Sequence, residues 1–152
     1  MERLQESIAP EGKMKISTYL KLIRQKVVSC KVEDSAQTVA KLLTDANIGA
    51  MPVLSDDGKI VGMISERDLT NRFAKLGADV TKLKVADMLT KSVTFMGPNA
   101  TLADAFNNMR GRSFRHIPVL ESGKVIGILS IRDVLEEFAV EVGVADDLSD
   151  PA

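Results

Sequence analysis

Short apolar runs alternate with amphipathic stretches along the chain, and this pattern predicts a mixture of strands and helices. Two apolar runs, Met51–Leu54 and Ile60–Ile64, flank a polar turn that contains a glycine, which indicates a β-hairpin. The stretch from Ala36 to Asn47 is typical of an amphipathic helix, because its apolar residues recur at helical spacing. These residues are Val39, Leu42, Leu43 and Ala46. A helix that packs on the following hairpin is therefore expected.

Further elements are predicted on both sides of this helix and hairpin. A second helix is expected over Glu66–Leu76, and Gly77 stands where a glycine commonly ends a helix. A short strand is expected at Val27–Ser29, and a short lead-in helix around Tyr19 precedes it. After the lead-in helix, the order of elements in this unit is therefore β-α-β-β-α.

The same order occurs twice, because the chain contains an internal repeat. The segment Ala50–Leu69 is repeated at His116–Val134, with the same Pro, Val, Leu, Gly, Lys, Gly, Ser, Arg and Asp at matching positions. Asp68 and Asp133 occupy the same place near the ends of the two segments, each directly after an arginine. The segments differ in length by a single position, which falls in the polar turn, where changes of length cost little.

The second copy is expected to contain the elements of the first. A lead-in helix is predicted at Val85–Leu89, a strand at Val93–Phe95 and a helix at Leu102–Gly111. A hairpin of Val119–Leu120 with Val125–Leu129 and a final helix at Ile131–Val142 follow. Thr101 and Asp104 have the spacing of a capping box at the start of the helix Leu102–Gly111. Gly143 is placed to end the last one.

One copy alone cannot bury the apolar face of so small a sheet, so the two copies are expected to pack together. The predicted fold class is α/β (α+β), with two repeats related by a pseudo-twofold axis, sheets packed together and helices outside. The predicted boundaries are residues 14–78 and 79–143 for the repeats, 1–13 for a polar N-terminal segment and 144–152 for an acidic tail. Ligand clefts are then expected in pairs where the repeats meet.

Composition narrows the classes of function. Lys and Arg total 20 against 21 Asp and Glu, so no strong positive field favours nucleic acid as a partner. No apolar run approaches the roughly 18 residues of a membrane span, and residues 1–13 lack the apolar core of a signal peptide. A soluble cytoplasmic protein is expected. One cysteine, Cys30, and one histidine, His116, are too few for a zinc cluster, so no metal site is expected.

Each hairpin ends in the pattern Gly-h-h-Ser-x-x-Asp, where h is apolar, over residues Gly62–Asp68 and Gly127–Asp133. With the order of elements and the duplication, this pattern resembles the cystathionine-β-synthase (CBS) domain family, over about Ser17 to Val142. Val85–Thr90 resembles the usual lead-in to a second CBS repeat, and Ser65–Asp68 and Phe114–Val119 resemble a bacterial branch of small stand-alone CBS proteins. The resemblance implies a pair of CBS domains, called a Bateman module, which binds AMP, ADP, ATP, S-adenosylmethionine or NAD(H). It also implies a regulatory module without catalytic residues or a required cofactor.

Ser65 and Asp68 admit two interpretations. In the first they only cap the helix, with the Ser65 hydroxyl and the Asp68 carboxylate each accepting from the other residue's backbone amide. In the second, the free amides at the helix N-terminus bind a phosphate and the carboxylate accepts hydrogen bonds from ribose hydroxyls. In the family the matching Asp holds ribose. Since Ser130 and Asp133 preserve the same residues, we predict that both carboxylates bind ligand.

Arginines accompany both motifs. Arg67 and Arg132 lie in the first helical turn, where a cation opposes the helix dipole unless an anion binds there. Arg72 follows one turn after Asp68 and has no basic counterpart in the second copy, because Glu137 takes its place. Each of the three is a candidate phosphate ligand, and the alternative is a solvated arginine or an ordinary ion pair.

The two copies differ most just before the second strand. The second copy has Arg115 and His116 where the first has Gly49 and Ala50. In the family, basic residues at this position often contact phosphates, so two unequal sites are predicted, and the one with Arg115 and His116 favours more phosphate charge. The alternative for His116 is a half-buried, hydrogen-bonded strand residue.

Apolar residues near the motifs are expected to line the purine pocket. Met51 and Ile117 precede the two prolines of the repeat, and Val28 lies in the first short strand. The alternative for each is a plain core residue. Cys30 is expected to be a buried strand residue.

Three classes of function compete. The first is an adenosine-nucleotide sensor, which shifts a helix pair that contacts an unidentified regulated protein. The second is an interaction module with vestigial sites, which acts through the helix that carries Leu135, Phe138 and Val142; a homodimer is expected in either case. The third is an enzyme, which is not expected because the chain offers no metal site, activated nucleophile or glycine-rich phosphate loop.

Overall fold

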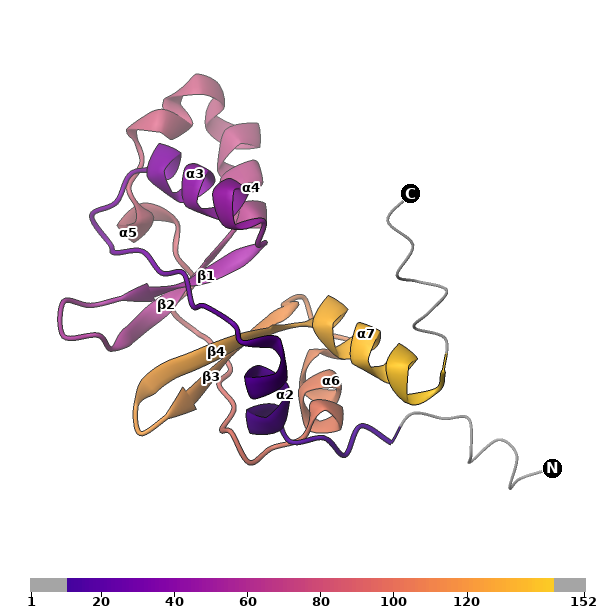
Figure 1. Cartoon of the computed structure of the whole chain (residues 1–152). Helices are drawn as coiled ribbons and strands as arrows, with labels where there is room; N and C mark the ends of the chain where they lie inside the picture. Colours follow the sequence, from indigo (N-terminus) through magenta and orange to yellow (C-terminus); the bar gives the residue numbers. More distant parts are fainter. Residues whose placement is uncertain (1–10, 144–152) are drawn as a thin grey trace. The chain divides into compact units, whose positions relative to one another are not determined.

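The structure, a computed structural model, describes residues 11–143 (Figure 1). Residues 1–10 of the predicted polar segment and the predicted acidic tail, 144–152, lie outside the described residues. The elements in chain order are α2 (Ile16–Ile23), α3 (Ala36–Ala46), β1 (Ala50–Leu54), β2 (Ile60–Ser65), α4 (Glu66–Leu76), η1 (Gly77–Lys82), α5 (Val85–Met88), α6 (Leu102–Met109), β3 (His116–Glu121), β4 (Lys124–Ser130) and α7 (Ile131–Glu141).

The predicted α/β (α+β) class is confirmed, and so are the predicted helices and both hairpins, whose ends agree to within about three residues. The strands form two small sheets, β1–β2 and β3–β4. Three of the helices begin with serine caps, Ser35 on α3, Ser65 on α4 and Ser130 on α7. The 3₁₀ helix η1 was not predicted. It begins at Gly77, whose positive φ of 57° ends α4.

The prediction of a short first strand in each copy was wrong. Residues 27–29 form no strand, and Cys30 makes a single parallel bridge with Val53. The Cys30 amide donates to the Pro52 carbonyl at 3.2 Å, and the Leu54 amide donates to the Cys30 carbonyl at 2.9 Å. The next bond of this ladder, toward Val28, would need an N–H from Pro52, which proline lacks. The second copy has Pro118 in the matching position, and its predicted strand is likewise reduced to a single bridge, at Met96.

The chain forms two compact units, and these cut across the sequence repeats. The α3–α4 unit contains residues 25–95 and 118–128. The α6–α7 unit contains the other described residues, 11–24, 96–117 and 129–143. The repeat boundaries at 14–78 and 79–143 describe the duplication of the sequence, and they stay a prediction.

In the α3–α4 unit, apolar residues of α3 pack against the hairpin β1–β2 and against α5. The fully buried members of this cluster are Val39, Met51, Val53, Ile64 and Val85. The lead-in of the second copy is held beside α3 by backbone bonds, from Ala36 to the Leu83 carbonyl at 3.1 Å and from Val85 to the Asp34 carbonyl at 2.9 Å.

In the α6–α7 unit, the lead-in of the first copy takes the equivalent place beside α6. The Ile16 amide donates to the Ala100 carbonyl at 2.8 Å, and the Leu102 amide donates to the Met14 carbonyl at 3.0 Å. The rings of Phe106 on α6 and Phe138 on α7 are 5.7 Å apart. The lead-in segments are thus exchanged, since each packs on the helix pair of the other copy.

The outer edge of β2 is paired with backbone. Met63 and Thr90 exchange two backbone hydrogen bonds, of 2.9 and 2.8 Å. A Cβ atom added to Gly62 would lie 2.6 Å from the Thr90 carbonyl oxygen. The absence of a side chain at this glycine therefore permits the close approach of the Thr90 backbone.

The outer edge of β4 is paired with a side chain instead. Ile128 corresponds to Met63 in the repeat. Gln25 pairs with Ile128 as Thr90 pairs with Met63. The Gln25 amide nitrogen donates to the Ile128 carbonyl at 2.9 Å, and the Ile128 amide donates to the Gln25 carbonyl oxygen at 2.7 Å. The side-chain amide of Gln25 thus replaces the backbone partner that the first hairpin has.

We predict that Gln25→Leu lowers the free energy of unfolding by about 1–3 kcal/mol, because it leaves both backbone groups of Ile128 without this partner. The signature is faster hydrogen exchange at the Ile128 amide, measured by NMR beside a denaturant titration. Lys26→Ala, at the neighbouring position, is the control and should leave both quantities unchanged. An unchanged exchange rate at Ile128 in Gln25→Leu would contradict the role assigned to the side chain.

Candidate functional site

The helices α4 and α7 begin with the same capping box. The Ser65 amide donates to Asp68 Oδ2 at 2.8 Å, and the Asp68 amide donates to Ser65 Oγ at 3.3 Å. In α7 the corresponding bonds, between Ser130 and Asp133, are both 3.0 Å. The capping interpretation of the duplicated motif is therefore confirmed as local geometry, and both carboxylates are half-buried.

Capping uses one oxygen of each carboxylate. Oδ2 of Asp68 accepts from the Ser65 amide and from the Ser65 hydroxyl, the latter at 3.1 Å. Oδ2 of Asp133 accepts from the Ser130 amide. Because a carboxylate has a second oxygen with its own lone pairs, each cap leaves acceptor capacity that capping does not require. The same caps fix the orientation of the two carboxylates at the helix N-termini.

The predicted arginines have different surroundings. Arg132 is exposed, and its Nε lies 3.0 Å from Glu136 Oε1, one turn later on α7. An exposed pair with this spacing contributes only about 0.3–0.5 kcal/mol, so an arriving phosphate can compete with it. Arg67 is exposed at the start of α4, and Arg72 lies one turn after Asp68. All three arginines are thus close to a capping aspartate along the chain. Arg132 already forms an ordinary ion pair.

The residue that precedes each hairpin is hydrogen-bonded to the first residue of the helix that follows the hairpin. The Glu66 amide donates to the Gly49 carbonyl at 2.9 Å, and the Ile131 amide donates to the Arg115 carbonyl at 2.9 Å. The predicted difference between the copies therefore lies directly at the helix N-termini, with Arg115 at α7 and a glycine at α4. His116 follows as the half-buried first residue of β3.

Two further arginines share the loop between α6 and β3, and the sequence interpretation missed them. Arg110 follows α6, and Arg112 lies over the Phe114 ring at 5.8 Å from its centre. With Arg115, they place three arginines in one short loop. The three closely spaced arginines were the sequence feature that could have identified Arg110 and Arg112 as candidates. The first copy has no arginine in the corresponding loop.

The apolar candidates belong to the packed interior. Met51 and Ile117 are fully buried, and Val28 packs against the core cluster of the α3–α4 unit. In this conformation Met51 and Ile117 present no side-chain surface to a ligand. The structure therefore favours the core alternative for these two residues.

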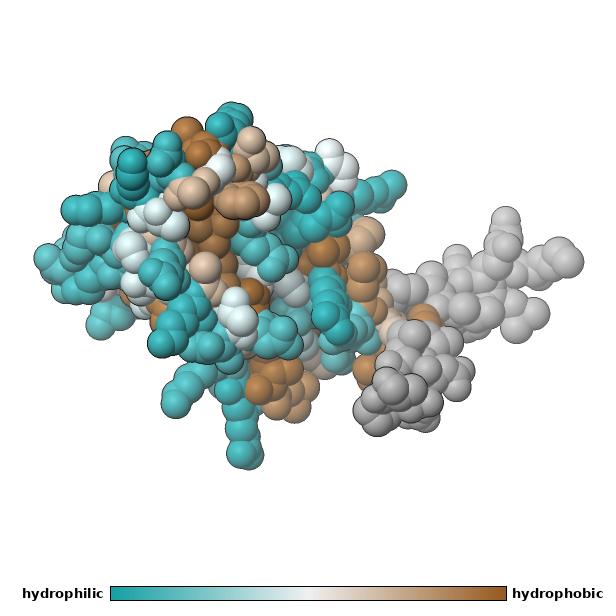
Figure 2. All heavy atoms as spheres, turned by 90° about the horizontal axis from the view of Figure 1, so that it is seen from above, coloured by the Kyte–Doolittle hydropathy of each residue, from teal (hydrophilic) through white to brown (hydrophobic). Residues whose placement is uncertain are grey.

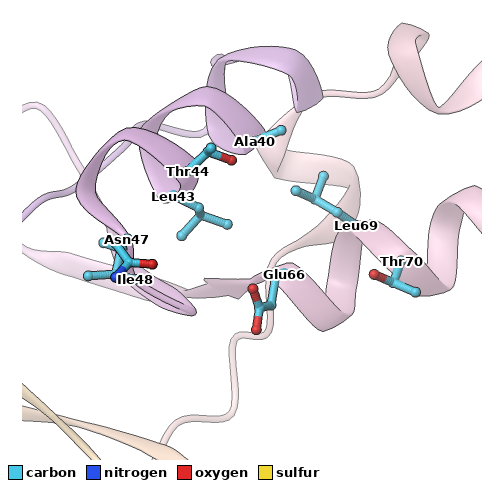
Figure 3. A pocket seen from close by; sticks show the side chains of 8 residues that line it. All are labelled: Ala40, Leu43, Thr44, Asn47, Ile48, Glu66, Leu69 and Thr70. Carbon is cyan, nitrogen blue, oxygen red and sulfur yellow. The ribbon is translucent and has the colours of Figure 1, made fainter. Parts of the chain in front are cut away.

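A hollow of about 370 Å³ lies between α3 and α4 (Figure 3). Leu43 of α3 and Leu69 of α4 point into it from opposite sides. Its other lining residues are Ala40, Thr44, Asn47, Ile48, Glu66 and Thr70. None of the predicted site residues lines the hollow, although Glu66 lies between two of them, Ser65 and Arg67.

Two buried side chains have displaced pKa values. Burial, and next the nearby Asp34 carboxylate, raise the pKa of the Cys30 thiol to about 12. Burial raises the pKa of the Tyr19 phenol, and the carboxylates of Asp133, Glu136 and Glu137 raise it further. Tyr19 on α2 thus lies near the first turns of α7, which the sequence did not indicate.

Other kinds of site find no support in the described part of the chain. Residues 11–143 contain no group of His, Cys, Asp and Glu side chains that could hold a metal ion. Among these same residues, no helix has both the length and the apolar character needed to cross a bilayer.

Known proteins resemble this chain over most of its length. The family described as CBS domain matches it twice, at residues 20–75 and 85–140. Hypoxic response protein 1 of Mycobacterium tuberculosis is 26% identical over 117 residues, which cover 74% of this chain and 82% of that protein. The crystal structure of the CBS-domain containing protein ATU1752 from Agrobacterium tumefaciens is 32% identical, with a TM-score of 0.77, and covers 83% of this chain and 94% of that one. The structure of CBSX2 in complex with AMP is 26% identical, with a TM-score of 0.67, and covers 86% and 98%.

We predict that the Cys30 thiol of the native protein reacts with iodoacetamide at pH 8 more than about 100-fold slower than a free cysteine, because only the thiolate reacts. Since the pKa is raised to about 12, the thiol stays protonated until the pH approaches that value. Mass spectrometry of timed samples gives the rate, and protein unfolded in urea is the control that should react normally. Rapid labelling of the native protein would contradict this account of Cys30.

Proposed function

Since this chain belongs to the CBS-domain family and carries two such domains in tandem, we propose that it is a non-catalytic regulatory module that binds an adenosine nucleotide. The AMP complex of CBSX2, a structural neighbour with 26% identity, supports this class of ligand. The observation that carries the proposal is the duplicated pair of capped carboxylates, Asp68 and Asp133, at helix N-termini.

The proposed contacts follow from the chemistry of these groups. Asp68 and Asp133 would accept hydrogen bonds from ribose hydroxyls through the oxygen that capping does not require. The amides of the first helical turn and the neighbouring arginines, Arg67, Arg72 and Arg132, would bind phosphate oxygens. The serines Ser65 and Ser130 would hold the carboxylates in place.

The two sites are proposed to differ in the phosphate charge that they favour. The loop at α7 carries Arg115, and His116 begins the adjacent strand, whereas the loop at α4 is uncharged at the matching positions, Gly49 and Ala50. Added cations favour a ligand with more phosphate charge, so ATP or the diphosphate of NAD(H) would bind the α7 site better than AMP. The α4 site would bind AMP with less dependence on charge.

We further propose that the module acts as a homodimer and reports nucleotide to a separate regulated protein. An interaction module with vestigial sites remains the second candidate, and exposed apolar side chains on α4 and α7 favour it. These are Phe73 and Leu76 on α4, and Leu135 and Val140 on α7. Nucleotide binding separates the two candidates, because only the first requires it.

We predict that a nucleotide present at about 100 times its Kd raises the free energy of unfolding by about 2.7 kcal/mol, and the Tm by several degrees. Thermal unfolding against AMP, ADP, ATP, NAD, NADH and S-adenosylmethionine measures the shift. Asp68→Ala combined with Asp133→Ala should abolish it, because both proposed ribose contacts are lost.

A matched control keeps this experiment specific to binding. Asp104 closes a capping box on α6 with Thr101, in the same geometry as the two site carboxylates. Asp104→Ala should therefore cost the stability of one cap, about 0.5–2 kcal/mol, and preserve the nucleotide shift. A shift that survives in the double Asp variant would refute the assigned carboxylates, and no shift with any nucleotide would favour the interaction module.

A further inference from the structure

The loop between α6 and β3, residues 110–115, concentrates positive charge. Hydrophilic side chains are widespread on the face seen from above (Figure 2), so an exposed charge does not by itself mark a site. In this loop, however, all three charges are positive, and no Asp or Glu occurs between Asp104 and Glu121. None of its arginines forms an ion pair with another residue of the described range 11–143. This part of the chain therefore offers the loop no counter-charge.

The loop is irregular because α6 ends early. Its last residue is Met109, whereas α3 continues for three more positions, to Ala46, which corresponds to Arg112. Gly111 has a positive φ of 71°, which glycine adopts without strain, and the chain leaves the helical path there. Every residue of the loop except Phe114 is exposed. The second copy thus presents to solvent a segment that the first copy keeps largely in a helix.

Ser113 lies within this loop, with Arg112 directly before it and Arg110 three residues before it. The exposed serines of residues 11–143 are Ser29, Ser92, Ser113 and Ser122. Of these four, only Ser113 has an arginine among the three residues that precede it. The serines of the site are different, because Ser65 and Ser130 are half-buried and their hydroxyls accept from backbone amides. One exposed serine is therefore distinguished by its charged surroundings.

We infer that Ser113 is a phosphorylation site for a protein kinase that recognises arginine on the amino-terminal side of its target. The guanidinium groups of Arg110 and Arg112 would pair with carboxylates of such a kinase. In the transfer, Oγ of Ser113 attacks the γ-phosphorus of ATP held by the kinase, and the bond from that phosphorus to the bridging oxygen of ADP breaks. The hydroxyl proton passes to the catalytic aspartate of the kinase. ADP leaves, and the serine carries a phosphate ester.

The phosphoryl group would find its counter-charges in the same loop. A phosphoserine carries about 1.5 to 2 negative charges at pH 7 and three strong acceptor oxygens. Arginine binds such oxygens through charge-assisted, often bidentate hydrogen bonds, and Arg112 and Arg115 lie within two residues of Ser113. Phosphorylation would therefore neutralise more than half of the positive charge of the loop.

The backbone of Arg115 joins the loop to the proposed α7 site. Its carbonyl accepts from the amide of Ile131, the first residue of α7, at 2.9 Å. The regulatory consequence rests on the proposed function, in which Arg115 favours nucleotides with more phosphate charge. A phosphoryl group at Ser113 would neutralise this cation and repel the nucleotide, so it would lower the affinity of the α7 site for ATP. The matching residues 44–49 contain neither arginine nor serine, so the α4 site would not respond.

Mass spectrometry of the full chain, after incubation with ATP and the catalytic subunit of cyclic-AMP-dependent protein kinase, tests the modification. We expect one phosphate per chain, on Ser113, and none in Ser113→Ala. Ser29→Ala, at an exposed serine that follows Lys26 by three residues, is the matched control and should be phosphorylated like the wild type. Arg110→Ala with Arg112→Ala should lower the kcat/KM of the kinase at least about tenfold, because charge-assisted pairs are lost. A native chain without phosphate on Ser113 would overturn the inference.

Nucleotide titrations of the phosphorylated protein test the consequence. In Asp68→Ala, which retains the α7 site, phosphorylation should raise the Kd for ATP about tenfold, the order expected for a like charge at short range near a protein surface. In Asp133→Ala, which retains the α4 site, the Kd for AMP should stay the same. Unchanged ATP binding by phosphorylated Asp68→Ala would refute the regulatory role.

The two measurements separate this inference from the proposed function. A chain that is phosphorylated on Ser113 but binds no nucleotide in either form would confirm the modification site and refute the proposed function. A chain that binds nucleotide but accepts no phosphate on Ser113 would refute the inference and leave the proposed function standing.

Discussion

The outer edge of each hairpin is the constraint on which the arrangement of the chain depends. Strand edges present N–H and C=O groups that need partners, and these hairpins have only two strands to share them. At Met63 the partner is the backbone of Thr90, and at Ile128 it is the side chain of Gln25. Satisfying the first edge brings the lead-in of the second copy onto the first hairpin. The exchanged lead-ins, and Gly62 without a side chain, follow from this pairing.

Local signals in the sequence were sufficient for most elements. Helix ends and hairpins were predictable because caps, glycines and hydrophobic spacing act over a few residues, as Ser65 and Asp68 illustrate. The third strand was predicted wrongly, although the reason was in the sequence, since Pro52 has no N–H to continue the ladder. The exchanged lead-ins and the ring contact of Phe138 depend on residues far apart along the chain. No local pattern could have indicated them.

Part of the candidate site was predictable because it also depends on local signals in the sequence. The capped carboxylates are local, and both were found as expected. The burial of Met51 and Ile117 is decided by long-range packing, so their assignment to a purine pocket could not be settled from strand position. Capping and binding, moreover, are not exclusive. A carboxylate that binds a diol must be held in one orientation, and the cap holds Asp68 and Asp133 in that way.

Among the positions at which the two copies differ, two have separate consequences for the structure. Arg115 in place of Gly49 changes the charge at one helix N-terminus and leaves the helix packing alone. Ala40 in place of Phe106 opens one helix pair and leaves both capped carboxylates alone. Because the two differences lie on different elements, the charge at a helix N-terminus and the packing of a helix pair can be altered independently. A duplicated fold with two identical copies would present the same surface and the same site twice, and could not separate these properties.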